Sequence, residues 1–108
     1  MPFATSPDGI RIHYEVIGST TPGAPSIVCH HGTRGSLQNW HRGGYVEALA
    51  SHTRLILIDS RGHGESDRPT TDGAYVLPKR ADDVAAVLDA TGTAEAVFWG
   101  YSMGGWVG

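Results

Sequence analysis

Hydrophobic and polar residues alternate over residues 10–17, where every second side chain is apolar. Such alternation is typical of a strand that buries one face, so the segment is predicted to be an antiparallel strand near the edge of a sheet. Residues 26–30, 54–58 and 94–99 are apolar runs without alternation. All three are predicted to be strands, and the unbroken run at 54–58 predicts a strand covered on both faces, as in a parallel sheet between layers of helices.

Two segments of the chain have helical spacing. The clearer helix is predicted to begin near Pro78, which suits a first helical turn, and to end at Gly92. A weaker helix is expected over residues 40–50, where Gly43 and Gly44 delay its start. The apolar positions of the clearer helix are Ala81, Val84, Ala85 and Leu88, with Asp82, Asp83 and Asp89 expected toward solvent. The alternation of strands and helices predicts an α/β fold with a mostly parallel sheet.

The composition excludes several classes of protein. The 108 residues carry eight Lys and Arg against eleven Asp and Glu, for a net charge of −3. This balance excludes nucleic-acid binding through a basic surface and gives no attraction to acidic membranes. The single Cys29 excludes an internal disulfide, and neither a signal peptide nor a membrane-spanning run is expected from the pattern of residues. A cytoplasmic location is therefore expected.

The most informative motif is Gly100-Tyr101-Ser102-Met103-Gly104, a G-x-S-x-G pattern. The pattern alone is common by chance, but here it directly follows an apolar strand, which is the setting that a nucleophile elbow requires. A sharp strand-to-helix turn would project the Ser102 hydroxyl from the start of a helix. Free backbone N–H groups there favour developing negative charge, so the amide of Met103 is a candidate oxyanion donor.

Two further loops follow strands that are expected to neighbour this turn. His30-His31-Gly32-Thr33 comes after the 26–30 strand, and its glycine lets the Thr33 amide point into a shared pocket as a second oxyanion donor. Residues 59–67 follow the 54–58 strand and carry two glycines within the loop. Open α/β folds place their sites at this edge of the sheet.

These three segments, in this order, resemble the α/β-hydrolase superfamily. The likeness rests on H-G-x at residues 31–33, D-x-R-G-x-G-x-S at 59–66 and G-x-S-M-G-G at 100–105. It implies the α/β-hydrolase fold, with Ser102 as nucleophile and the Thr33 and Met103 amides as the oxyanion hole. The group with these motifs includes esterases, enol-lactonases, perhydrolases and carbon–carbon bond hydrolases. No cofactor or metal is implied, and Ser rather than Asp at the elbow disfavours epoxide hydrolases and haloalkane dehalogenases.

One departure from the family pattern concerns the catalytic triad. The family order is Ser, then Asp or Glu, then His, whereas residues 103–108 contain neither a carboxylate nor an imidazole. We therefore expect residues 1–108 to be the N-terminal portion of a single α/β-hydrolase domain that is inactive alone. The expected activity is hydrolysis of a small-molecule ester, lactone or related acyl bond through an acyl-enzyme.

Two alternatives to this hydrolase remain open. The first is a non-catalytic module that keeps the fold and binds a small ligand. The second is an inert fragment, in which the 94–99 strand would form a bare apolar edge that favours aggregation.

The remaining candidate residues have less specific roles. His31 and His63 lack the spacing of a zinc site, so packing or supporting hydrogen bonds are favoured over metal binding or a role as the base. Asp59 is expected to organise its loop, with Arg61 as a candidate partner, rather than to serve as the triad acid. His13 is expected to be solvated on its strand's polar face. The core is expected to contain Cys29, Trp40 and Trp99.

Overall fold

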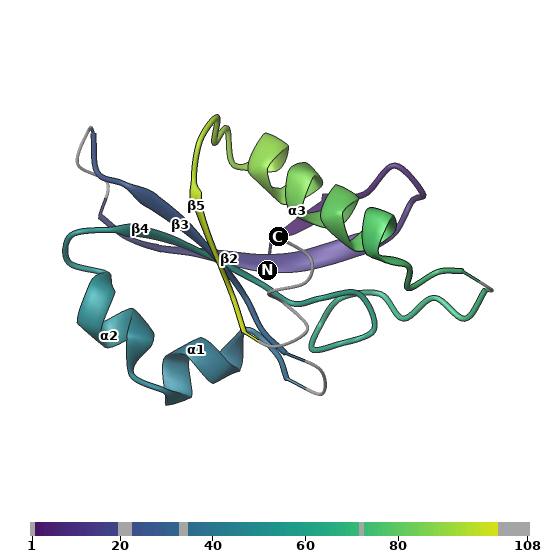
Figure 1. Cartoon of the computed structure of the whole chain (residues 1–108), viewed down its shortest axis with the longest axis horizontal. Helices are drawn as coiled ribbons and strands as arrows, with labels where there is room; N and C mark the ends of the chain where they lie inside the picture. Colours follow the sequence, from purple (N-terminus) through teal and green to yellow (C-terminus); the bar gives the residue numbers. More distant parts are fainter. Residues whose placement is uncertain (1, 20–22, 33–34, 72, 102–108) are drawn as a thin grey trace.

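A five-stranded sheet with helices on both faces forms the structure (Figure 1). The computed structural model describes residues 2–19, 23–32, 35–71 and 73–101. The strands are β1 (Phe3–Thr5), β2 (Arg11–Gly18), β3 (Ser26–His30), β4 (Arg54–Ile58) and β5 (Val97–Gly100). The helices are α1 (Gln38–Arg42), α2 (Tyr45–Leu49) and α3 (Leu77–Ala90). No helix within the described ranges is long and apolar enough to cross a membrane.

The sheet is mixed, with strand order β1-β2-β4-β3-β5. β2 runs antiparallel to both β1 and β4, as its alternating pattern predicts. β3 runs parallel to β4 and β5, as the apolar runs predict. The sheet is therefore mixed: β3, β4 and β5 form its parallel part, as expected, and the short β1 extends the antiparallel side. β5 occupies the opposite edge, as expected.

The apolar run of β4 supplies two cores, one on each face of the sheet. Ile56 and Ile58 pack on the face covered by α3, together with Val84 and Val87 of that helix. Leu55 and Leu57 pack on the face covered by α1 and α2, against a cluster that includes Cys29, Leu37 and Trp40. Figure 1 shows α3 on one side of the sheet and the two short helices on the other. Burial on both faces explains why β4 lacks a polar alternation.

The weaker helical segment forms two short helices instead of one. Gly43 and Gly44 lie between them, and Gly44 has a φ of +80°. Left-handed backbone of this kind favours glycine and ends a helix. The break turns the chain so that Trp40 of α1 and Tyr45 of α2 pack with ring centroids 5.3 Å apart.

The long helix α3 has the predicted position but a different buried face. Pro78 lies in its first turn, and Gly92, with a φ of +65°, follows its end. The buried residues are Asp83, Val84 and Val87, so the expectation that Asp83 faces solvent is wrong. Its carboxylate is buried because it pairs with the side chain of Arg61.

Candidate active-site edge

The ends of three parallel strands lie together at one edge of the sheet. His30, the last residue of β3, is in register with Ile58 of β4 and with Gly100 of β5. The amide of Tyr101 then donates a hydrogen bond to the carbonyl of His30 at 3.1 Å. The loops that begin at residues 31 and 59 therefore leave the sheet at the same edge as the end of β5. The predicted site residues Thr33, Ser102 and Met103 lie outside the described residues.

Asp59 organises the loop at the end of β4, as predicted, but through different partners. One carboxylate oxygen, Oδ1, accepts the amide of Leu37 at 2.8 Å. The other, Oδ2, accepts the amide of Glu65 at 3.0 Å and Nδ1 of His13 at 2.7 Å. The buried carboxylate thus joins β2, the start of α1 and its own loop. The guanidinium of its expected partner Arg61 binds the carboxylates of Asp8 and Asp83 instead.

His13 is buried rather than solvated, which corrects the expectation from the alternating pattern. Only 5% of its surface is exposed. Its backbone amide donates to the hydroxyl of Ser66 at 2.8 Å, and that hydroxyl donates to the carbonyl of Asp59 at 2.7 Å. The loop after β4 therefore covers the face of β2 that the pattern assigned to water.

Gly64 has no room for a side chain because it lies against Asp59. A Cβ at position 64 would lie 2.2 to 2.4 Å from the carboxyl atoms of Asp59, and the φ of Gly64 is +51°. Both the close approach and the backbone conformation require glycine. This residue therefore lets the loop wrap around the carboxylate.

His31 is a buried, neutral side chain with both ring nitrogens occupied. Nδ1 donates to the carbonyl of Gly32 at 2.7 Å, and Nε2 accepts the amide of Ser60 at 2.9 Å. Burial lowers the pKa of His31. The ring supports the loop after β3, as the packing interpretation predicts, and in this arrangement has no free nitrogen for a base.

The side chains of His30 and His63, which lie near His31, also form hydrogen bonds with backbone carbonyls. Nδ1 of His30 donates to the carbonyl of His31 at 3.0 Å, and burial lowers the pKa of His30 to about 4. His63 pairs through Nδ1 with the carbonyl of Arg61 at 3.0 Å, and its ring centroid lies 5.1 Å from that of His31. Within the part of the chain that the structure describes, no group of three His, Cys, Asp or Glu residues could hold a metal ion.

Arg61 is fully buried between two carboxylates. Its guanidinium binds Asp83 through Nε at 2.8 Å and Nη2 at 2.6 Å, and binds Asp8 through Nη1 at 2.9 Å and Nη2 at 3.0 Å. A fifth contact joins Nη1 to the carbonyl of Ala74 at 2.7 Å. All five guanidinium donors are therefore used. Sequence reasoning missed this cluster, because Asp8 lies in an ordinary turn and Asp83 was assigned to the solvent face.

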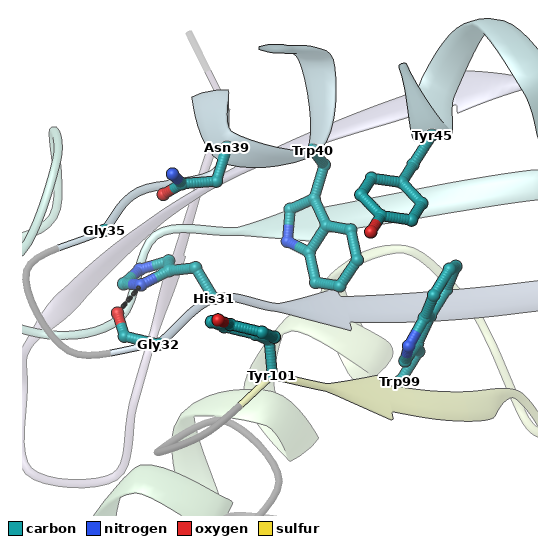
Figure 2. A pocket seen from close by; sticks show the side chains of 8 residues that line it. All are labelled: His31, Gly32, Gly35, Asn39, Trp40, Tyr45, Trp99 and Tyr101. Carbon is teal, nitrogen blue, oxygen red and sulfur yellow. Dashed lines mark hydrogen bonds between the residues drawn. The ribbon is translucent and has the colours of Figure 1, made fainter. Parts of the chain in front are cut away.

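A cavity of about 370 Å³ opens beside the ends of β3 and β5 (Figure 2). Aromatic side chains form much of its lining, and His31 with glycines of the loop after β3 completes it. The aromatic residues are Trp40, Tyr45, Trp99 and Tyr101. Trp40 is buried as predicted, but Trp99 is 37% exposed, because β5 is an edge strand with no neighbour on its outer side among the described residues.

Comparisons with known proteins agree with this architecture. An esterase from a Rhodococcus species has a solved structure that is 41% identical, with a TM-score of 0.87, and the match covers 98% of this chain and 38% of that one. The bifunctional esterase/perhydrolase of Acinetobacter calcoaceticus is 37% identical over 105 residues, which cover 97% of this chain and 36% of the relative. The epoxide hydrolase 4 of Mus musculus is 30% identical over 99 residues, which cover 92% of this chain and 26% of the relative.

These relatives are enzymes of different specificity built on one fold. The chain spans little more than a third of the length of the first two and about a quarter of the third. A family model described as the alpha/beta hydrolase fold matches residues 25–108. Because this match covers most of the chain and agrees with the mixed sheet and its solved relatives, the chain belongs to the α/β-hydrolase fold family.

Proposed function

We propose that this chain supplies the nucleophile and oxyanion-hole segments of a serine hydrolase that cleaves a carboxylic ester, lactone or related acyl bond. Ser102 attacks the carbonyl carbon and forms an acyl-enzyme, which water then hydrolyses. The backbone amides of Thr33 and Met103 stabilise the negative charge on the carbonyl oxygen. The triad acid and His come from residues beyond position 108, so residues 1–108 alone are inactive.

The observation that carries this proposal is the parallel register of β3 and β5. His30 and Gly100 are paired, and the amide of Tyr101 bonds to the carbonyl of His30. In the sequence, Thr33 follows His30, the last residue of β3, by three positions. The end of β3 adjoins the end of β5, and β5 is the strand that precedes Ser102 in the sequence. An oxyanion hole needs two amides that converge on one oxygen, and adjacent strand ends favour that convergence.

Buried side chains hold the loops after β3 and β4 in place at the same edge of the sheet. His31 fixes the loop after β3 through hydrogen bonds to Gly32 and Ser60, while Asp59 fixes the loop after β4. Preorganised donors lower the cost of reaching the transition state, so a rigid frame suits an oxyanion hole. The Ser at position 102 favours acyl transfer over the epoxide opening of some relatives, because the resemblance assigns an Asp nucleophile to those enzymes.

Labelling with a fluorophosphonate probe tests the proposal in the full-length protein. We expect the probe to label the wild type and the Ser102→Ala variant to remain unlabelled. The exposed Ser51 lies in the turn before β4, so Ser51→Ala is the matched control and should label like the wild type.

Each of the other possible results would contradict a different part of the proposal. A wild type that folds but does not label would contradict the hydrolase and favour a non-catalytic binding module. Labelling that persists in Ser102→Ala would place the nucleophile elsewhere. Wild-type activity on an epoxide without activity on p-nitrophenyl acetate would overturn the acyl chemistry.

A further inference from the structure

We propose that the cavity beside the ends of β3 and β5 binds a flat ring that carries a hydrogen-bond acceptor oxygen, with the indole N–H of Trp40 as its donor. The proposal deepens the proposed function, since it names the substrate class of that site and rests on it. The binding itself requires no turnover, so it can be tested separately from hydrolysis.

The walls of the cavity are aromatic rings in mutual contact. The ring centroid of Trp99 lies 5.1 Å from that of Trp40 and 5.0 Å from that of Tyr45, and the Tyr45 and Trp99 planes are at 90°. Figure 2 shows these three side chains at one end of the cavity and Tyr101 nearer to His31. Aromatic faces and edges favour contact with another ring over contact with water.

The buried Trp40 side chain has an unused hydrogen-bond donor. The residue is only 4% exposed, and its Nε1 has no hydrogen-bond partner among the residues that the structure describes. Figure 2 shows the nitrogen-bearing edge of the indole on the side toward His31 and Asn39, which also line the cavity. A buried donor without a partner is unfavourable, so an acceptor at this point would be favoured.

The ring nitrogens of His31 and the side-chain oxygen of Asn39, which lie near this donor, already have hydrogen-bond partners. Both nitrogens of His31 are used by Gly32 and Ser60, and Oδ1 of Asn39 accepts the amide of Ser36 at 2.7 Å. An acceptor in the cavity therefore meets the Trp40 N–H without competition from those atoms. The buried indole N–H of Trp40 in a largely aromatic lining fits a ligand with a carbonyl or ether oxygen better than a charged ligand.

The volume limits the size of the occupant. An apolar cavity of about 150 Å³ accepts benzene. The cavity here measures about 370 Å³, which suffices for a substituted ring or a fused pair of rings. The substrate class that follows is an aromatic or flat cyclic ester or lactone with an additional oxygen on its ring portion.

Acetophenone and ethylbenzene test the proposal, because they differ chiefly in the carbonyl oxygen. Their dissociation constants are measured on the full-length protein by quenching of tryptophan fluorescence and by ligand-detected NMR. We expect the wild type to bind acetophenone more tightly. Trp40→Phe keeps a ring but removes the donor, so it should weaken acetophenone about tenfold and change ethylbenzene by less than about twofold.

A second variant separates the donor from the aromatic wall. Trp99→Leu should weaken both compounds to a similar degree, because it removes ring contact and leaves the Trp40 donor in place. Equal effects of Trp40→Phe on both compounds, or failure of both to bind the folded wild type, would overturn the proposal; the latter result would mean that other parts of the protein fill the cavity. Selective binding without fluorophosphonate labelling would retain the ring site and reject the hydrolase.

Discussion

Asp59 and His13 form a buried hydrogen bond of 2.7 Å between the loop after β4 and the middle of β2. The carboxylate also accepts the amides of Leu37 and Glu65, so a single side chain connects three segments that are distant in sequence. Buried carboxylates are stable only when such donors compensate for lost hydration. Asp59 is therefore expected to contribute strongly to the stability of this edge of the sheet.

Replacing Asp59 with Asn should destabilise the protein by about 2 to 4 kcal/mol, because the amide brings donors to a site that already holds them. Urea unfolding of the full-length protein measures the loss. Asp67→Asn is the control: Asp67 pairs with the exposed Arg11, and a clearly smaller loss is expected there. Equal losses in the two variants would mean that the Asp59 network adds no more than a surface ion pair.

Gly64→Ala should also destabilise the loop, through steric overlap with the same carboxylate. The added Cβ would lie within 2.4 Å of three carboxyl atoms, so Asp59 or the loop must move. Gly92→Ala provides the matched control, since its φ of +65° imposes similar backbone strain and no atom lies within 4 Å of the added Cβ. We expect a loss of about 1 kcal/mol at Gly92 and at least twice that at Gly64, measured by thermal or urea unfolding.

Local patterns in the sequence predict the centre of the fold well. The apolar runs give the bounds of β3 and β4 as observed, because strands buried on both faces leave a continuous signal. The three-residue β1 was missed, since so short a strand has no periodicity to read. β5 begins later than predicted, at Val97 instead of residue 94, because residues 94–96 form an irregular connection with a bend at residue 94.

Burial of polar side chains was harder to predict than the strands. His13 and Asp83 occupy positions that alternation or helical spacing assigns to solvent, and both are buried by partners distant in sequence. A pattern along one element carries no information about a loop that later covers it. The site residues Thr33, Ser102 and Met103 rest on motifs and the family resemblance, and their roles stay predictions.

Arg61→Lys should destabilise the protein by about 2 to 4 kcal/mol. Lysine has three donors on a single nitrogen and cannot reproduce the planar contacts with both Asp8 and Asp83. Arg11→Lys changes an exposed pair, in which the Arg side chain is 62% exposed, and should have a clearly smaller effect on stability. Chemical unfolding at neutral pH measures both. A loss at Arg61 no larger than that at Arg11 would show that the buried guanidinium geometry is not needed.

Acidification should destabilise the protein through the buried His30. Because burial lowers the pKa of His30 to about 4, the unfolded chain takes up a proton near pH 6.5 while the folded protein does not. The stability is therefore complete above about pH 6.5 and falls as the pH drops toward 4, by a total on the order of 3 kcal/mol from this residue. His31, whose pKa is also lowered by burial, acts in the same direction.

Urea unfolding of the full-length protein between pH 4 and 7 measures this slope. His30→Asn keeps an N–H donor near the position of Nδ1 but removes the titration, so the slope of the free energy of unfolding against pH should become shallower. The exposed His52 lies in the turn before β4, and His52→Asn should leave the slope as in the wild type. If the His30 variant kept the full wild-type slope, the acid sensitivity would have to come from other groups, because a neutral side chain at position 30 cannot take up the proton on unfolding.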